Sequence, residues 1–232
     1  MKTGLCTLVF IGMAVPFKVM VLIPGLTEIR PVNAVPIVVG LLFGPEGALG
    51  CAVGNLVADL FGTFSAASVF GVLGNFTAAY LPYKIWYMNG NKELPNVKTN
   101  KNILRFIIIA IVSSLSVAVI LSCGLDILNE LWGKSIFLIV FLNDFGFSLF
   151  LGMPVFIVLT SEQLNISFTI PKAFIPSEKN ILRKRVLFIM LVVSGIIFSF
   201  LVCMGIRFIE SWVMIVSSIV FSMSAAAFMI KK

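Results

Sequence analysis

The sequence contains no histidine, and charged residues make up only 12% of its 232 residues. Without histidine the chain cannot form a His-dependent catalytic triad, and most zinc, nickel and cobalt sites are excluded. Neither GxxxxGKS nor GxxxxGKT is present, so the chain cannot hydrolyse ATP by P-loop chemistry. The four cysteines are widely spaced and include no CxxC pair, which is typical of small apolar filler. We therefore expect no catalytic residue, no metal ion and no cofactor.

Apolar residues are abundant: they make up 59% of the chain, and the mean hydropathy is +1.10. Soluble domains are nearer half apolar and about a quarter charged. A globule of this size could not cover so much apolar surface with its few polar groups, so lipid must solvate much of it. The net charge of +7 resides in a few loops without interleaved aromatic residues, which argues against nucleic acid as a partner. We predict an all-α membrane protein in contact with the lipid bilayer.

Eight apolar segments follow one another along the chain. Six of them are long enough to cross about 30 Å of hydrocarbon. The second and third are shorter and are joined by Gly-Pro-Glu-Gly, which membranes tolerate where the segment packs in protein or lines a cavity. The pattern predicts a polytopic helix bundle with segments at Gly4–Ile23, Val32–Phe43, Gly47–Gly62, Val69–Tyr87, Ile103–Cys123, Ser135–Thr160, Val186–Gly205 and Trp212–Ile230.

The loops between these segments differ strongly in positive charge. If Lys2 is inside and every segment crosses, most of the 17 Lys and Arg residues lie inside; only Arg30, Lys134 and Arg207 lie outside, and Lys18 lies within a helix. Lys and Arg mark the cytoplasmic side of membrane proteins. This predicts a multi-pass protein of a prokaryotic cell membrane with both termini in the cytoplasm. If the two short segments formed a re-entrant pair instead of crossing, all other loops would lie on the same sides of the membrane.

Polar side chains inside or at the mouth of the apolar segments are the candidate binding groups. A carboxylate within a membrane helix is costly and needs a partner or a wet cavity, so it marks a functional site by default. Asn55 and Asp59 share one helix face because they are four residues apart. With the predicted topology, groups from four segments lie in the outer half of the membrane, as an outward-facing polar cavity for a small solute would require. The predicted substrate-binding residues are Arg30, Asn33, Asn55, Asp59, Asn75, Asn143 and Asp144.

Alternatives remain open for these residues. Asn and Asp commonly hydrogen-bond neighbouring membrane helices, so the same side chains could serve only to hold helices together. Arg30 could also form a purely structural salt bridge with one of the carboxylates. Small residues at helical spacing, such as Gly50 and Gly54, indicate close packing of helices rather than contact with a ligand. Pro82 and Pro154 are expected to bend their helices.

A block rich in proline and glycine carries the most specific signal. It comprises Arg-Pro-Val-Asn from Arg30, PIVVGLLFGPEGALGCAVGNLVADLFG from Pro36 to Gly62, and SVFGVLGNFTAAYLPYKIW from Ser68 to Trp86. This block resembles the substrate-binding S components of energy-coupling factor (ECF) transporters, especially the branch of the queuosine-precursor transporters.

The resemblance implies a six-helix module that binds a vitamin or similar small micronutrient from outside the cell. In that family the module docks on a transmembrane scaffold subunit that two cytoplasmic ATPases drive, and the binding loops would be 24–31 and 63–68 here. The chain would then divide into an S-component-like core over 1–160, a basic cytoplasmic loop over 161–185 and two additional transmembrane helices over 186–232. These two helices, and the lack of an Ala-x-x-x-Ala docking face in the first segment, depart from the family pattern.

The first functional hypothesis is therefore a substrate-capture subunit of an ECF-type uptake transporter. A stand-alone secondary transporter, in which Asp59 or Asp144 binds a proton or Na⁺, is the main alternative, although the absence of an internal repeat disfavours it. A non-catalytic structural subunit is a further alternative. An intramembrane aspartyl protease built on the same two carboxylates is disfavoured, because ADLFG and NDFG lack the YD and GxGD patterns of that family. We expect the chain not to be an enzyme.

Overall fold

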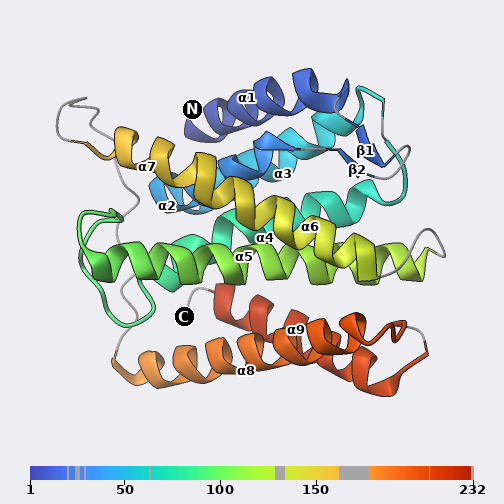
Figure 1. The fold of residues 1–232 in the computed structure, drawn as a ribbon. Helices are drawn as coiled ribbons and strands as arrows, with labels where there is room; N and C mark the ends of the chain where they lie inside the picture. The colour runs from blue at the N-terminus through green and yellow to red at the C-terminus, as the bar shows by residue number, and fades with distance from the viewer. Residues whose placement is uncertain are drawn as a thin grey trace.

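Almost all of the chain that the structure describes is helical, which confirms the predicted all-α membrane bundle (Figure 1). The long helices lie side by side along one common direction, and α1 begins and α9 ends at the same end of the bundle (Figure 1). The computed structural model describes residues 1–19, 21–23, 27–28, 30–62, 64–128, 134–161, 178–208 and 210–230.

Short irregular elements connect some of the helices. The strands β1 (Val21–Ile23) and β2 (Thr27–Glu28) pair in antiparallel fashion between the 3₁₀ turns η1 (Val15–Val19) and η2 (Pro31–Asn33). A π-helical turn, η3 (Ser148–Gly152), lies between α6 and α7. The α-helices are α1 (Lys2–Ala14), α2 (Ala34–Phe43), α3 (Pro45–Asp59), α4 (Ser68–Trp86), α5 (Asn100–Ile127), α6 (Lys134–Phe147), α7 (Met153–Leu159), α8 (Glu178–Cys203) and α9 (Trp212–Met229).

The first helix is shorter than predicted. We expected it to reach Ile23, but α1 ends at Ala14 and the chain continues as η1 and β1. Pro16 explains this end, because proline has no backbone N–H and its ring clashes with the carbonyl group one turn earlier in an α-helix. Pro16 therefore predicts the observed end of this helix near Ala14.

The sixth apolar segment, predicted as one helix over Ser135–Thr160, is interrupted by η3. The π turn ends directly before Met153 and Pro154, which occupy the first positions of α7. A π turn accommodates an extra residue within a helix, so the helix can resume at the proline. The disturbance that we expected at Pro154 takes the form of this π turn.

Four described helices are long and apolar enough to cross a membrane on their own, whereas we expected six such segments. One reason is the early end of α1, and another is α4, whose amide, proline and lysine residues lower its hydropathy. The four helices are Asn100–Ile127, Ile136–Leu159, Asn180–Cys203 and Trp212–Met229.

The start of α8 also differs from the prediction. We expected residues 161–185 to form a loop and a helix to begin at Val186, but α8 begins at Glu178. The stretch 178–185 is rich in Glu, Leu, Lys and Arg, which are good helix formers, and charge alone does not end a helix. Residues 162–177 of the predicted loop lie outside the described part of the chain.

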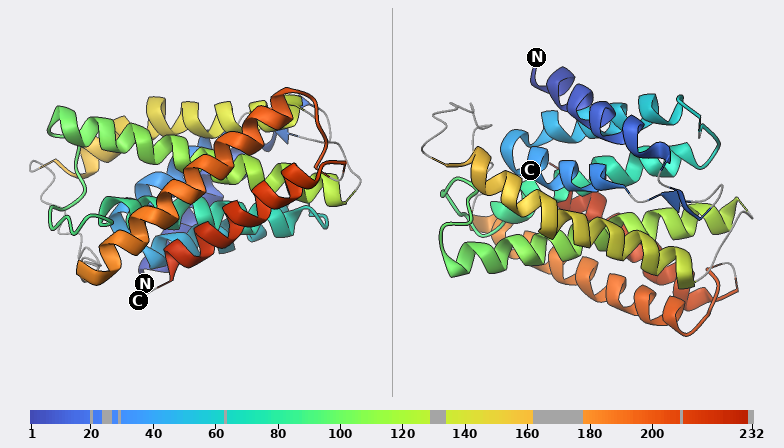
Figure 2. Two further views of the ribbon diagram at one scale, coloured as in Figure 1. Left: turned by 90° about the horizontal axis from the view of Figure 1, so that it is seen from below. Right: turned by 45° about the horizontal axis from the view of Figure 1, so that its top comes forward.

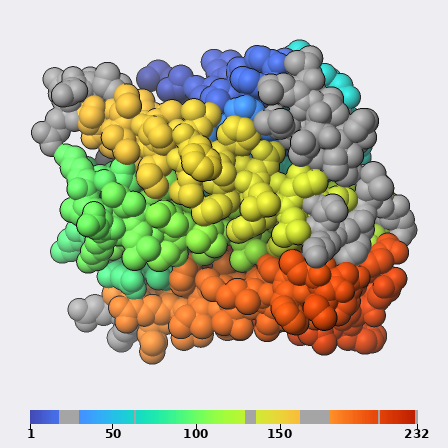
Figure 3. All heavy atoms as spheres, viewed as in Figure 1, coloured from blue at the N-terminus to red at the C-terminus, as the bar shows by residue number. Residues whose placement is uncertain are grey.

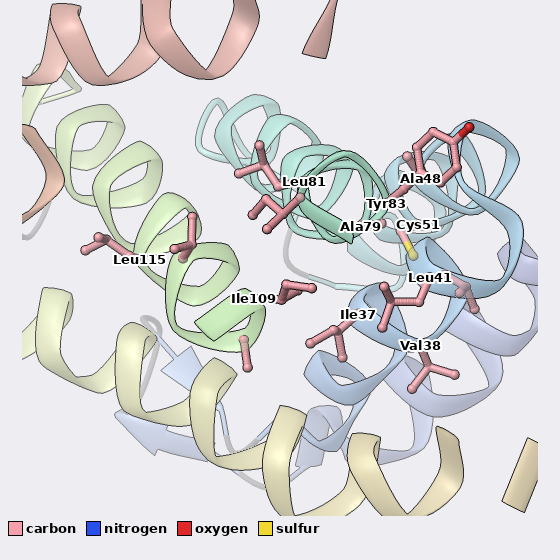
Figure 4. Packing of buried hydrophobic residues seen from close by; sticks show 14 of the residues in the cluster. Ile37, Val38, Leu41, Ala48, Cys51, Ala79, Leu81, Tyr83, Ile109 and Leu115 are labelled. Carbon is pink, nitrogen blue, oxygen red and sulfur yellow. The ribbon is translucent and has the colours of Figure 1, made fainter. Parts of the chain in front are cut away.

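The helix α2 lies in the centre of the bundle, and all its residues from Ala34 to Phe43 are buried. Ile37 and Leu41 of α2 are among the apolar side chains that fill the space between α2, α4 and α5 (Figure 4). The close approach of α2 to α4 depends on Gly40, because a Cβ atom there would lie 1.9 Å from the carbonyl oxygen of Ala79. Glycine thus lets the two backbones touch.

The glycine pair Gly50 and Gly54 packs α3 against α1. A Cβ atom at Gly50 would lie 2.4 Å from Cβ of Cys6, and one at Gly54 would lie 2.7 Å from Cβ of Phe10. This confirms that these glycines serve close helix packing.

The helices α8 and α9 form a C-terminal hairpin that lies across one face of the bundle (Figure 2). In the space-filling view the side chains of α8 form a band beside those of α5 and α6 (Figure 3). At one end of the hairpin, Arg207 donates a hydrogen bond of 2.9 Å to the buried carboxylate of Asp126 on α5. At the other end, Nζ of Lys184 donates to the carbonyl oxygen of Ile230, 2.9 Å away, just beyond the last turn of α9. Charged groups therefore fasten both ends of this hairpin.

Candidate functional site

A small polar cavity lies in the interior where η2, α2, α4, α5 and the α6–η3 segment meet. Its volume is about 10 Å³, which is room for a group the size of one water molecule. Six of the side chains that line it are polar, and three are apolar. The lining residues are Asn33, Pro36, Ile37, Asn75, Ala78, Ser113, Ser114, Asp144 and Ser148.

Asp144 and Asn33 form one side of the cavity. Asp144 is buried on α6, and its Oδ1 accepts a hydrogen bond from Nδ2 of Asn33. Asn33 is the last residue of η2, directly before α2, so the turn at Pro31 sets the position of its amide. The two residues are 111 positions apart in the sequence, and their bond ties the connector between α1 and α2 to α6.

Asn55 is the centre of a second hydrogen-bonded group. Its Nδ2 donates to Oδ2 of Asp59 at 3.1 Å, one turn further along α3. Its Oδ1 accepts from Nδ2 of Asn75 at 3.0 Å and from Nη2 of Arg30 at 3.4 Å. Gly71 makes room for this arrangement, because a Cβ atom there would lie 2.9 Å from Nδ2 of Asn55.

Asn75 connects the two groups, since it both lines the cavity and donates to Asn55. Its Nδ2 also donates to the carbonyl oxygen of Gly71 at 3.0 Å. The cavity wall carries one carboxylate, Asp144, and no lysine or arginine, while the guanidinium of Arg30 belongs to the adjoining group. The cavity therefore favours neutral or cationic hydrogen-bond donors over anions.

The structure brings together six of the seven predicted site residues, and Asn143 is the exception. Asn143 is half-buried and is not among the residues that line the cavity. It directly precedes Asp144, and neighbouring residues on an α-helix point about 100° apart. Whether any of these residues binds a substrate stays a prediction.

Sequence reasoning missed the serines of the cavity, Ser113, Ser114 and Ser148. A signal was available for two of them, because Ser-Ser-Leu-Ser at 113–116 interrupts an otherwise apolar segment. Serine in membrane helices commonly bonds to its own backbone, so this run did not stand out.

A comparison with protein-family models identifies the relatives of the chain. The model of the QueT transporter family matches residues 1–161, well over half of the sequence. The chain belongs to the QueT transporter family. QueT is a family of ECF S components, the queuosine precursor transporters, which confirms the resemblance stated above. Searches of curated proteins and of solved structures each found no matching protein.

Membership of the QueT family makes the chain a membrane transporter S component for a small substrate. The family indicates a transporter rather than an enzyme. All residues that line the cavity lie within the part that the QueT model matches, whereas α8 and α9 lie beyond its last matched residue.

Proposed function

We propose that the chain captures a queuosine precursor, or a chemically similar micronutrient, from outside the cell as the substrate-binding subunit of an ECF-type transporter. A transmembrane scaffold subunit and two cytoplasmic ATPases would supply the energy. The observation that carries the proposal is the cavity at Asp144, Asn33 and Asn75, which gathers polar side chains from separate elements inside the QueT-matched region.

The chemistry of this cavity suits a small heterocycle. The amides of Asn33 and Asn75 each offer donors and an acceptor, and the carboxylate of Asp144 accepts. A nanomolar ligand requires about 12 kcal/mol, which a few desolvated polar contacts and an apolar stack can supply. Because the cavity is only about 10 Å³, binding requires its walls to part.

The proposed orientation places the cavity toward the outside and both termini in the cytoplasm. Supporting this, α1 begins and α9 ends at one end of the bundle (Figure 1). The basic loop between α4 and α5 and the basic start of α8 meet at that end, where Nε of Arg185 donates to Oδ1 of Asn89 at 2.9 Å. By the positive-inside rule this end is cytoplasmic. We further propose that 1–160 forms the substrate-binding core and that the helices within 186–232 are an addition to it.

The test is binding of a queuosine precursor to the purified full chain in detergent, measured by isothermal titration calorimetry. We expect Asp144→Asn to weaken binding by about tenfold or more, because it replaces one of the two carboxyl oxygens in the cavity wall by an amide donor. Asp59→Asn should have a smaller effect, since Asp59 acts through Asn55. Asn143→Ala is the matched control and should bind within about twofold of the wild type. Unchanged binding by both aspartate variants, with normal folding, would show that the cavity is not the site.

Energy coupling has a separate test, purification with native partners followed by mass spectrometry. A scaffold subunit and two ATPases should co-purify with the chain. Precursor uptake that continues in cells lacking the ATPases would instead favour the secondary transporter, with Asp59 or Asp144 as the ion-binding carboxylate.

A further inference from the structure

The side-chain hydroxyl of Ser114 is buried and forms no hydrogen bond with any group in the described part of the chain. Its side chain is on α5 and only 2% exposed, and its Oγ has no hydrogen-bond partner. Buried polar atoms are nearly always paired, so each unpaired one needs an explanation. The position of Ser114 supplies one, because the residue lines the polar cavity between α2, α4, α5 and α6.

The neighbouring serines of α5 behave differently. Oγ of Ser113 donates to the carbonyl oxygen of Ala78 at 2.7 Å, and Oγ of Ser116 donates to the carbonyl oxygen of Ser113 at 2.6 Å. A helical serine ordinarily uses such backbone carbonyls. Ser114 has this option in principle and does not take it, so its hydroxyl remains available to whatever enters the cavity.

The groups that share the cavity with Ser114 restrict what can enter. Oδ1 of Asp144 accepts the hydrogen bond from Asn33, whereas the hydroxyl of Ser114 can both donate and accept. No lysine or arginine lines the cavity, and Arg30 in the adjoining group already interacts electrostatically with Asp144, so an anionic group would compete with that carboxylate for Arg30. The closed cavity of about 10 Å³ has room for one amino or hydroxyl group, and a ring needs the additional space that opens when the walls part.

We propose that Ser114 and Asp144 together bind one amino-type substituent of the solute, neutral or cationic, at the inner end of the site. The ring that carries this substituent then lies further out, toward Asn75 and Arg30. This inference rests on the proposed function, because it assigns a residue and a substrate feature to the same site. Ser114 is a specificity-determining residue, and its hydroxyl gains its missing partner when the solute binds.

The experiment compares Ser114→Ala with Ser122→Ala in the full-length protein. Ser122 is on the same helix, is also 2% exposed and also has no partner for its Oγ, but it does not line the cavity. Two probes are titrated into each protein: a queuosine precursor with a free amino substituent, and its analogue with hydrogen in place of that group. Melting temperatures are recorded alongside.

We expect the wild type and Ser122→Ala to prefer the amino compound equally. Ser114→Ala should bind it about 5- to 20-fold more weakly and should lose most of the preference over the analogue. A purely structural role predicts a change in melting temperature for both alanine variants and no change in either affinity. That result, together with weaker binding by Asp144→Asn, would overturn the assignment of Ser114 and leave the proposed function intact. No binding of either probe by the wild type would overturn both.

Discussion

The amides and carboxylates around the cavity and the serines of the C-terminal hairpin form their hydrogen bonds in two different ways. Around the cavity, amides and carboxylates bond across helices, as Asn33 does with Asp144 and Asn75 with Asn55. In the hairpin, Ser194 and Ser217 donate to carbonyl oxygens of their own helices. A local bond of that kind persists whatever lies beside the helix, including lipid, whereas a bond across helices requires one particular arrangement. Apart from Lys184 and Arg207 at the two ends of the hairpin, the hydrogen bonds across helices described here lie around the cavity.

The two parts also differ in how helices approach each other. Gly40 of α2 brings backbone against backbone at Ala79, while Gly195 of α8 meets the side-chain end of Leu115, which lies 2.6 Å from the Cβ position. A backbone carbonyl cannot rotate away, but the tip of a leucine can. The core is thus packed more rigidly at this point than the contact between the hairpin and α5.

The largest effect is expected from Gly40→Ala. The added methyl group would sit 1.9 Å from the Ala79 carbonyl oxygen, so the helices must separate, at a cost of about 3 kcal/mol or more. Gly195→Ala should cost about 1 kcal/mol, because Leu115 can repack. Thermal melting in detergent micelles measures both. Equal losses would mean that the two contacts are equally rigid.

A smaller difference is expected between Asn55→Leu and Ser217→Ala. Leucine at 55 leaves the side chains of Asp59, Asn75 and Arg30 without their bonds to the amide, which should lower stability by about 2–3 kcal/mol. Ser217 is buried but bonds only to Met214 of its own helix, so its loss should stay within about 0.5 kcal/mol. A Ser217→Ala variant as unstable as Asn55→Leu would contradict the distinction between local and tertiary polar bonds.

The smallest effect concerns the attachment of the hairpin to α5. Arg207→Gln removes the cation from Asp126, which is fully buried; Arg207 itself is 42% exposed, so water screens part of the interaction. We expect a loss of stability smaller than that of a fully buried pair. Adding Asp126→Asn should restore part of it, because no buried charge is then left.

Glu210→Gln is the control for this pair, since Glu210 lies on the exposed side of Arg207 at 3.9 Å. It should leave the melting temperature unchanged. A double variant that is no more stable than Arg207→Gln would show that the ion pair does not fasten the hairpin.

Some of the site followed from local geometry and could be predicted. The contact between Asn55 and Asp59 depends only on their spacing along one helix. The sequence could not show that Asp144 rather than Asn143 lines the cavity, because the rotation of α6 about its axis is set by packing against other helices. The position of Ser114 at the cavity could not be predicted either. A serine in a membrane helix can bond to its own backbone whether it faces lipid, protein or a cavity, so the residue type does not indicate which it faces.

The fold shows a similar division. Composition alone predicts a helical membrane protein, because no other arrangement hides the backbone of so apolar a chain. The early end of α1 at Ala14 could also have been predicted, because Pro16 follows two residues later. The helical start of α8 at Glu178 could likewise have been predicted, from the helix-forming residues of 178–185. The π turn before Pro154 could not, because a proline within a helix indicates a disturbance but not its form.

The bond between Asp126 and Arg207 has a consequence for biogenesis. The two residues are 81 positions apart, so the ribosome completes α5 well before the arginine is made. During that interval the carboxylate has no Arg207 to pair with, and an ionised carboxylate resists entry into hydrocarbon. Its final burial must wait for the last two helices to insert. A segment beyond the QueT match thus completes a polar contact of α5, a helix within that match.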